Sequence, residues 1–220
     1  MKRLAILGAS GHGKVVAEIG ELSGWDEIVF FDDNYRGEIS IEGWSVEGNT
    51  SDLISHLYDF DGVVVAVGNN NVRLEKFLLL QSMEANLVSL FHPTSVVSRY
   101  ARVGVGTVIM AGAVVNPFAT LGMACIVNTG ATVDHDCFLA DGVHISPGAN
   151  LAGAVKIGKN SWVGIGASVK QCVQIGENVI IGAGSVVISE ITDEVFAYGV
   201  PAKVKSLRIM DHAGCKNVKY

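Results

Sequence analysis

The 220-residue chain has little charge, little proline and few cysteines. Charged residues make up 17% of it against 49% apolar residues, and only 4 prolines stand beside 26 glycines. This balance indicates extensive, regular burial. The four cysteines, Cys125, Cys137, Cys172 and Cys215, form no C-x-x-C pair, so the sequence favours neither a zinc ribbon nor a disulfide framework. We expect reduced thiols, mostly in the core.

The chain also lacks an excess of basic residues and a long apolar run. Its formal net charge is −6, which disfavours nucleic acid as a partner. No apolar run reaches the roughly 18 residues that a membrane span needs, and the first ten residues are too short and too glycine-punctuated for a convincing signal peptide. We therefore expect a cytoplasmic protein that does not insert into a membrane.

The first part of the chain, residues 1–92, alternates short apolar runs with helix-like segments. Strands are predicted at 3–8, 27–33, 62–68 and 87–91, and helices at 13–24, 51–60 and 71–84. Such alternation is typical of parallel strands with right-handed crossovers. It predicts a small Rossmann-like α/β domain with a ligand crevice at the carboxyl ends of its strands.

The second part, residues 93–220, follows a period of six and ends in a C-terminal tail. Every sixth residue from Val97 is a branched aliphatic, and a small or β-branched side chain such as Cys125 or Cys137 stands four residues after each. A six-residue period predicts an all-β parallel β-helix in which both positions point inward, so these two cysteines belong to the core. Residues 18 apart should stack at roughly 4.8 Å. The sixteen aliphatics are Val97, Val103, Ile109, Val115, Leu121, Val127, Val133, Leu139, Ile145, Leu151, Ile157, Val163, Val169, Ile175, Ile181 and Val187.

Among the outward positions, His135 is the strongest candidate for chemistry. It stands at a corner of its hexad between Asp134 and Asp136, and a histidine beside a carboxylate can act as a general base near neutral pH. Gly153, 18 residues further on, should stack over it and leave a backbone N–H open to a ligand as an oxyanion donor. His144 lies half a coil away. The plain alternative is a surface histidine.

A metal site is an alternative for the same residues. His135, His144, Asp134 and Asp136 could supply ligands, but three imidazoles do not occur at the positions that a β-helix zinc site needs. We expect no metal.

The glycine cluster after the first predicted strand suggests a nucleotide site. It matches G-x-x-x-x-G-K from Gly8 to Lys14, but Val15 replaces the Ser or Thr that would hold magnesium, which disfavours a kinase or ATPase. It is not G-x-G-x-x-G, which disfavours a dehydrogenase. Asp32 and Asp33 follow at about the spacing of a ribose-binding acid. A purely structural glycine turn remains the alternative.

Taken together, four features resemble one family. The hexads, YGVPAKV at 198–204, DHDC at 134–137 and GASGHGK at 8–14 resemble the bacterial nucleotide-amino-sugar N-acetyltransferases of the PglD type, which are related to the NeuD-like sugar O-acetyltransferases. The resemblance covers nearly the whole chain. It implies a left-handed β-helix, a homotrimer, and acetyl-CoA as co-substrate in the groove between neighbouring β-helices, with no metal.

The resemblance also implies roles for single residues. His135 matches the general base that takes a proton from the sugar amine, Asp136 its acidic neighbour, and Gly153 the glycine whose N–H meets the thioester oxygen. The acetyl-CoA site is implied to comprise Asn128, His144, Gly153, Gly164, Ile165, Gly182, Ala183 and Lys203. The site for the nucleotide of the acceptor is implied to comprise Gly8, Ser10, Gly11, His12, Gly13, Asp32, Asp33, Gly68, Asn69 and Asn70.

The leading interpretation is an acetyl-CoA-dependent N-acetyltransferase. Its acceptor would be the 4-amino group of a UDP- or dTDP-linked 4-amino-4,6-dideoxy sugar, used in O-antigen (lipopolysaccharide) or glycoprotein glycan synthesis. One alternative is a sialic-acid-type sugar O-acetyltransferase, which shares both domains. Another is a non-catalytic scaffold that uses the flat faces of the β-helix only to assemble.

Overall fold

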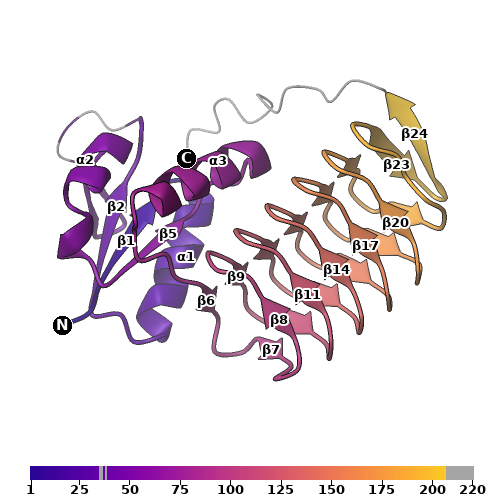
Figure 1. Cartoon of the computed structure of the whole chain (residues 1–220), viewed down its shortest axis with the longest axis horizontal. Coiled ribbons are helices and arrows are strands. Elements are labelled where there is room, and N and C mark those ends of the chain that lie inside the picture. The colour runs from indigo at the N-terminus through magenta and orange to yellow at the C-terminus, as the bar shows by residue number, and fades with distance from the viewer. Residues whose placement is uncertain (35–36, 38, 207–220) are drawn as a thin grey trace.

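The computed structural model describes residues 1–34, 37 and 39–206 of the chain. Figure 1 shows an α/β domain lying beside the first coils of a long parallel β-helix. The architecture predicted from the two sequence patterns is therefore confirmed. Cys215 and the rest of the predicted C-terminal tail after residue 206 lie outside the described residues.

The α/β domain is built on a five-stranded sheet in the order β3-β4-β2-β1-β5. Strand β1 is apolar and buried from Leu4 to Leu7 because β2 and β5 flank it on both sides. All pairs are parallel except β3 with β4. The strands are β1 Arg3–Leu7, β2 Glu27–Phe31, β3 Ile39–Ile41, β4 Trp44–Gly48 and β5 Gly62–Val65.

The hairpin of β3 and β4 was not predicted from the sequence. Its two-residue turn, Glu42 and Gly43, has φ of 50° and 101°, as a tight hairpin turn of the primed type requires. The hairpin adds two strands at the edge beside β2. In the sequence, only the glycine of this turn indicates the hairpin, because its two strands contain no long apolar run.

Three helices and one short 3₁₀ helix complete the domain. They are α1 Gly11–Leu22, α2 Thr50–Ser55, η1 Leu57–Asp59 and α3 Asn70–Ser82. Asn49 begins α2 with a capping box in which its side chain accepts from the backbone N–H of Asp52 and the Asp52 carboxylate accepts from the backbone N–H of Asn49. Asn69 caps α3 by accepting from the N–H of Val72. The helices predicted at 13–24 and 71–84 are thus present with shifted ends, whereas the one predicted at 51–60 is divided into α2 and η1.

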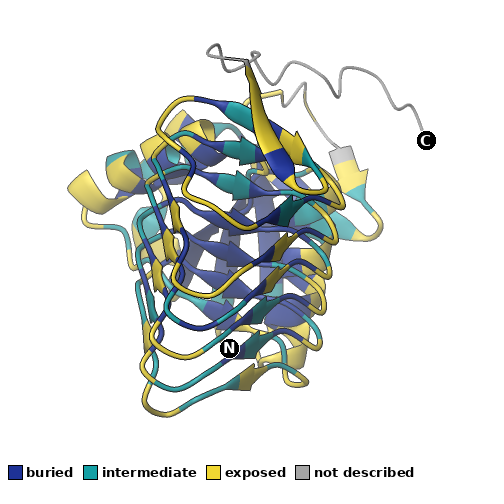
Figure 2. Cartoon of the chain, turned by 90° about the vertical axis from the view of Figure 1, so that its right-hand side faces the viewer, coloured by how far each residue is buried: buried dark blue, intermediate teal, exposed yellow. Residues whose placement is uncertain are grey.

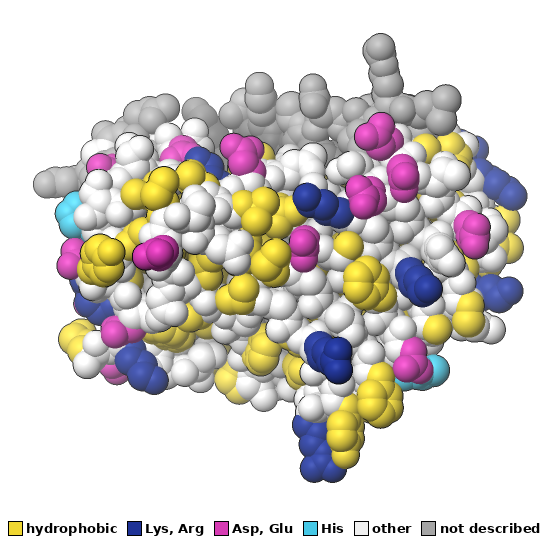
Figure 3. All heavy atoms as spheres, in the orientation of Figure 1, with side chains coloured by type: hydrophobic (Ala, Val, Ile, Leu, Met, Phe, Trp, Pro, Cys, Tyr) yellow, Lys and Arg dark blue, Asp and Glu magenta, His cyan; other side chains and the backbone are white. Residues whose placement is uncertain are grey.

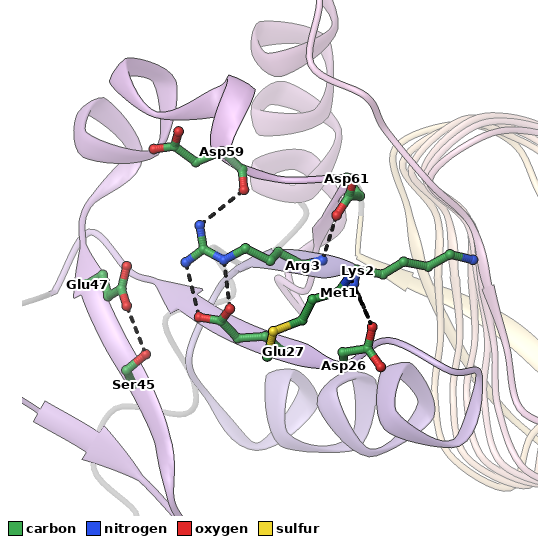
Figure 4. A network of polar contacts seen from close by, with 9 residues as sticks. All are labelled: Met1, Lys2, Arg3, Asp26, Glu27, Ser45, Glu47, Asp59 and Asp61. Atoms are coloured by element: carbon green, nitrogen blue, oxygen red, sulfur yellow. Dashed lines mark hydrogen bonds and ion pairs between the residues drawn. The ribbon is translucent and has the colours of Figure 1, made fainter.

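The amino end of the sheet is held by a polar network around Arg3 (Figure 4). The guanidinium contacts both carboxylate oxygens of Glu27 at 2.8 and 3.1 Å and the carbonyl of Asp59 at 3.1 Å. The Arg3 N–H donates to Asp61 at 2.8 Å. These contacts join β1, β2 and the segment before β5, at the end of the sheet opposite to the ligand crevice expected at its carboxyl end.

The β-helix has three flat faces, and the strands from β6 to β22 are two residues long and pair in parallel with strands 18 residues away. The longer strands β23 and β24 end the first face, and they pair with each other antiparallel. The first face holds β6 Leu90–Phe91, β9 Val108–Ile109, β12 Ile126–Val127, β15 His144–Ile145, β18 Trp162–Val163, β21 Ile180–Ile181, β23 Phe196–Gly199 and β24 Ala202–Ser206. The second face holds β7 Val96–Val97, β10 Val114–Val115, β13 Thr132–Val133, β16 Asn150–Leu151, β19 Ser168–Val169 and β22 Val186–Val187. The third face holds β8 Arg102–Val103, β11 Thr120–Leu121, β14 Phe138–Leu139, β17 Lys156–Ile157 and β20 Gln174–Ile175.

The inward positions of the hexads form one continuous core (Figure 2). Cys125 and Cys137 are buried in it as predicted, whereas Cys172 is exposed. Burial raises the pKa of both core thiols to about 11, so neither is a thiolate at neutral pH. The first β-helix strand is β6, which pairs with β9, so Leu90 and Phe91 belong to the β-helix although they precede residue 93.

The α/β domain packs on the first face through apolar and polar contacts. Helix α1 buries Val16 and Ile19 in a cluster that also contains Leu90, Val108 and Ile126 of the β-helix. This helix therefore lies between the sheet of the domain and the β-helix. Helix α3 follows the edge between the third and first faces, where Arg73 donates to β-helix carbonyls. Within the described ranges, no helix is both long and apolar enough to cross a membrane.

Candidate active site

A crevice lies at the carboxyl ends of β1, β2 and β5, where the sequence predicted a ligand site. It encloses about 260 Å³. Five of the predicted nucleotide-site residues line it: Gly8, Ser10, Asp32, Asp33 and Gly68. The lining residues that the sequence did not single out are Leu7, Asn34, Ala66, Val67, Val72 and Lys76. In the sequence, the only indication that Lys76 lines the crevice is its position on the helix that follows the third predicted strand.

The glycine turn after β1 is shaped by a close backbone approach. Gly8 has φ of 116°, and a Cβ on it would lie 2.6 Å from the carbonyl oxygen of Ala66. Only glycine fits such a position without strain. The turn thus brings β1 and the end of β5 together, which gives the crevice its floor.

Both crevice carboxylates are already engaged by the protein. Asp32 accepts from the N–H of Ala9 and of Asn34, each at 2.8 Å. Asp33 accepts from the hydroxyl of Thr50 at 2.6 Å and contacts Lys76 Nζ at 2.7 Å. Burial tends to raise the pKa of Asp33, but the hydrogen bonds from Lys76 and Thr50 outweigh it and lower the pKa to about 2. These carboxylates organise the crevice and keep only part of their accepting capacity for a ligand.

The other predicted nucleotide-site residues, Gly11, His12, Gly13, Asn69 and Asn70, do not line this crevice. Asn70 turns to the β-helix and donates to the carbonyls of Asn160 and Ser161 at 3.0 and 3.2 Å. His12 Nε2 is buried and has no hydrogen-bond partner among the described residues. Burial, with the nearby charge of Arg73, lowers the pKa of His12 to about 4.

His135 stands at the edge between the second and third faces, called here the His135 edge. Its Nδ1 lies 2.7 Å from Asp136 Oδ2. A carboxylate only accepts hydrogen bonds, so Nδ1 carries the proton and Nε2 keeps a free lone pair. The contact is possible because Asp136 has φ of 58°, which turns its short side chain back to the ring. The hydrogen bond to Asp136 raises the pKa of His135, and the charge of Asp134 raises it further.

Asp134 anchors the other side of the histidine. It accepts from the N–H of His135 at 2.7 Å and from the side-chain amide of Asn116 at 2.8 Å, and these two bonds lower its pKa. Asn116 lies 18 residues before Asp134, one coil away. The sequence pattern did not single out this support.

Gly153 stacks against the His135 ring, as the 18-residue spacing predicted. A Cβ on Gly153 would lie 2.6 Å from both Cε1 and Nε2 of the ring. The N–H of Gly153 donates to no group in the described part of the chain. The free lone pair of His135 and an unused backbone donor therefore lie side by side, an arrangement that can bind a reacting carbonyl next to a base.

His144 occupies a different environment. It is 8% exposed on the first face under the α/β domain, and its ring stacks on Trp162 with centroids 5.5 Å apart. Asn128 Oδ1 accepts from the N–H of Thr129, so its amide nitrogen donates to His144 Nε2 at 3.2 Å. Burial lowers the pKa of His144 well below its ordinary value, and the charge of Arg73 lowers it further. This histidine is neutral and is not an exposed base.

The remaining residues predicted to bind acetyl-CoA gather at the edge between the first and second faces, called here the Gly164 edge. Asn128, Gly164 and Gly182 follow β12, β18 and β21 at spacings of 36 and 18 residues, with Ile165 and Ala183 exposed beside them. A Cβ on Gly164 would lie 2.5 Å from the carbonyl oxygen of Ile181. Lys203 is exposed on β24, opposite Tyr198 of β23.

The predicted site residues thus occupy three separate places in one chain. The crevice belongs to the α/β domain on the first face, the Gly164 edge borders that face, and the His135 edge lies opposite it. Asn128 and Asp134 stand at the two ends of one strand segment of the second face, β13 with its preceding turn. Groups of three or more metal-ligating side chains do not occur in the described ranges.

Two family models match the chain. Residues 3–78 match the PglD N-terminal domain, and residues 154–189 match the bacterial transferase hexapeptide model of six repeats. A curated UDP-N-acetylbacillosamine N-acetyltransferase of Bacillus subtilis is 40% identical over 113 residues, 50% of this chain and 52% of that protein. The matched segment therefore spans about half the length of that relative.

Solved structures resemble the chain over almost its full length. The acetyltransferase domain of PglB from Neisseria gonorrhoeae, in complex with acetyl coenzyme A, is 44% identical with a TM-score of 0.89, covering 93% of this chain and 99% of that one. PerB from Caulobacter crescentus, in complex with CoA and GDP-perosamine, is 36% identical with a TM-score of 0.89, covering 94% and 98%.

Proposed function

The chain belongs to the PglD-type family of sugar acyltransferases, and on that premise we propose that it is an acetyl-CoA-dependent N-acetyltransferase of a nucleotide-linked amino sugar. The proposed acceptor group is the 4-amino group of a 4-amino-4,6-dideoxy sugar. The single observation that carries this proposal is the contact of His135 with both Asp136 and Gly153.

The proposed reaction uses these three residues in succession. The acceptor amine attacks the carbonyl carbon of the thioester while His135 Nε2 takes its proton, and the N–H of Gly153 donates to the developing oxyanion. The carbon–sulfur bond then breaks, and the proton on His135 passes to the leaving thiolate of CoA. Asp136 holds Nδ1–H and stabilises the imidazolium that forms between the two steps.

Acetyl-CoA is the co-substrate. Relatives of the chain bind acetyl-CoA or CoA, and the Gly164 edge offers small residues at Gly164, Gly182 and Ala183 next to the exposed apolar side chain of Ile165. Asn128, held by the neutral ring of His144, would lie at the thiol end of that edge. A metal is not required, because a positioned base, an oxyanion donor and proximity suffice for acyl transfer.

The crevice would hold the nucleotide of the acceptor. Its glycine turn presents backbone N–H groups, and Lys76 supplies a positive charge that Asp33 partly neutralises. UDP or dTDP is expected from the resemblance, but a relative binds GDP-perosamine, so GDP-linked acceptors should be tested as well. The product would serve O-antigen or glycoprotein glycan synthesis, and the cytoplasmic location expected from the sequence is part of this proposal.

A homotrimer would bring the separated groups together. The crevice and the His135 edge lie on opposite sides of one β-helix, and the Gly164 edge is a third place. Transfer needs the amine, the thioester and the base within contact distance. A neighbouring copy can place its His135 edge next to the crevice of the first copy. Within a single copy, an acceptor bound in the crevice cannot reach the His135 edge on the opposite side of the β-helix.

A thiol-release screen tests the proposed function. Purified protein is given acetyl-CoA with UDP-, dTDP- and GDP-linked 4-amino-4,6-dideoxy sugars, and free CoA is measured with time. We expect release with at least one acceptor and a mass increase of one acetyl group on that acceptor. Acetylation of free sialic acid without turnover of any amino sugar would favour the O-acetyltransferase alternative and overturn the proposal.

A further inference from the structure

Two aromatic side chains lie stacked in solvent at the His135 edge. The rings of Tyr100 and Phe118 have centroids 5.7 Å apart and an interplanar angle of 29°, and the two residues are 51% and 63% exposed. Arg99 lies over the Tyr100 ring, with Cζ 4.8 Å from the centroid, and its Nη2 donates to the Tyr100 hydroxyl at 2.7 Å. We call these three residues the aromatic platform. In Figure 3, hydrophobic and basic side chains gather at the lower edge of the β-helix, next to an acidic side chain and a histidine.

The platform lies directly beside the proposed base. Phe118 and Asp136 are 18 residues apart at the same corner, so they stack in neighbouring coils at roughly 4.8 Å. The coils are tied there by two bonds: Asp136 N–H donates to the carbonyl of Pro117 at 3.3 Å, and the Asn116 amide donates to Asp134 at 2.8 Å. A ligand that reaches His135 along this edge from the amino-terminal coils must cross the two rings.

The backbone of Phe118 is not one that an aromatic residue favours. Its φ is 64°, and the other residues other than glycine with such a φ in the β-helix are smaller or polar: Ala124, Asp136, Ala154, Asn160, Cys172, Asn178 and Glu194. Left-handed backbone costs about 1–2 kcal/mol for a residue with a Cβ. Burial does not offset this cost because the ring is mostly in solvent. The core therefore gives no reason for a large aromatic side chain here, whereas a ligand beside the base would.

The charge and shape of the platform fit a nucleotide-linked deoxy sugar. Across the described residues, no carboxylate forms an ion pair with Arg99, so its guanidinium is available to a phosphate. A sugar ring that lacks the 6-hydroxyl presents a methyl group and C–H bonds, and these gain free energy by leaving water against an aromatic face.

We infer that Tyr100 and Phe118 form the acceptor-sugar subsite beside His135 and determine preference for a 6-deoxy sugar, with Arg99 contacting the diphosphate. This inference rests on the proposed function. The occupant is the acceptor presented by a neighbouring copy, because the crevice of the same chain lies on the opposite side of the β-helix. A sugar carrying a 6-hydroxyl would have to remove that hydroxyl from water against the ring faces, which offer no hydrogen bond, so it should be disfavoured by about 10- to 100-fold in kcat/KM.

The experiment compares acceptors with and without the 6-hydroxyl on Phe118→Ala, Phe118→Tyr and wild-type protein. Phe118→Ala should raise the acceptor KM at least tenfold and reduce the preference for the 6-deoxy sugar, while the KM of acetyl-CoA and the mass by light scattering stay unchanged. Phe118→Tyr, which keeps a ring, should restore most of the preference. Ile188→Ala is the matched control, since Ile188 is 51% exposed at the same edge three coils from Asp134, and it should behave as wild type.

Three outcomes would overturn the inference. If the wild-type protein transfers acetyl and Phe118→Ala has unchanged acceptor kinetics, the proposed function holds and the proposed subsite is wrong. Dissociation of the assembly in Phe118→Ala would identify the platform as an interface between copies. A wild-type protein that transfers acetyl to no amino sugar would overturn the proposed function and the subsite with it.

Discussion

The ring of His135 is held between a carboxylate and a glycine, and each contact has a separate role in the proposed chemistry. Asp136 fixes the proton on Nδ1 at 2.7 Å, and Gly153 leaves the space beside Nε2 open. A surface histidine without a role would need neither contact. The two contacts can therefore be tested separately.

Replacing Asp136 by Asn should change the pH dependence of the reaction. The base must be neutral, so kcat/KM rises with pH through the pKa of His135, and Asp136 is the largest cause that raises this pKa. In Asp136→Asn the pKa of His135 falls, and the rising limb moves to lower pH. The maximal rate should also fall about tenfold because the ring loses its orientation. A pH profile of kcat/KM measures both effects, and an unshifted limb would contradict the assigned contact.

Replacing Gly153 by Ala should displace the ring. The new methyl group would meet Cε1 and Nε2 at 2.6 Å, so either the histidine or the backbone must move. We expect kcat to fall by about 100-fold, since an oxyanion donor and the base are both misplaced. Gly24→Ala is the control, because Gly24 has φ of 84° with open space around it and lies far from the site. Equal kcat values for the two variants would argue against a role for Gly153.

Among the elements, the hexads and the glycine turn were the parts that the sequence predicted well. An unbroken period of six is typical of a parallel β-helix and of no other common fold. Gly8 is required because the carbonyl of Ala66 approaches its backbone too closely for a side chain. The contacts of helix α3 with the β-helix were not predictable, because a helical pattern does not say which edge its polar side chains meet. The side chains of His12 and Asn70 do not line the crevice, for the same reason: the α/β domain packs on the β-helix at that place.

Arg73 is the centre of that docking. It is 1% exposed and donates to the carbonyls of Ala124 at 2.8 Å, Gly142 at 2.7 Å and Val67 at 3.0 Å, and to Asn70 Oδ1 at 3.0 Å. Burial lowers its pKa to about 10, so it remains charged at neutral pH. One side chain thus ties the wall of the crevice to two coils of the β-helix.

Replacing Arg73 by Met should destabilise the protein. The carbonyls of Ala124 and Gly142 would lose their donor in a buried place, which costs about 1–3 kcal/mol for each group. We expect the free energy of unfolding to fall by about 3 kcal/mol in denaturant titrations. Arg102→Met, at an exposed arginine on the third face, is the control. A loss no larger than that of the control would show that the interface does not depend on Arg73.

For the whole molecule, the separation of the crevice from the His135 edge is the feature that a sequence could not disclose. Residue patterns predicted each group of residues, but the side of the β-helix that the α/β domain covers depends on packing between distant segments such as Val16 and Ile126. That packing places the proposed acceptor site and the proposed base of one chain on opposite sides. The account therefore requires that copies cooperate.

Mixed assemblies test this requirement. His135→Asn removes the base, and Gly68→Trp fills the crevice at a glycine whose Cβ position has open space. Each variant alone should be inactive. If sites form between copies, randomly mixed assemblies should regain about a quarter of wild-type activity, because one in four adjacent pairs joins an intact crevice to an intact base. Co-expressed mixtures without activity would contradict a shared site.

The central claim is that His135 is the base of an acetyl transfer, and the most direct test is His135→Asn assayed for both turnover and binding. We predict that kcat falls by about 10²- to 10⁴-fold, while calorimetric affinities for CoA and for the acceptor nucleotide stay within about twofold, because His135 lies outside the crevice and the Gly164 edge. A kcat equal to that of the wild-type protein, with both ligands still bound, would contradict the account.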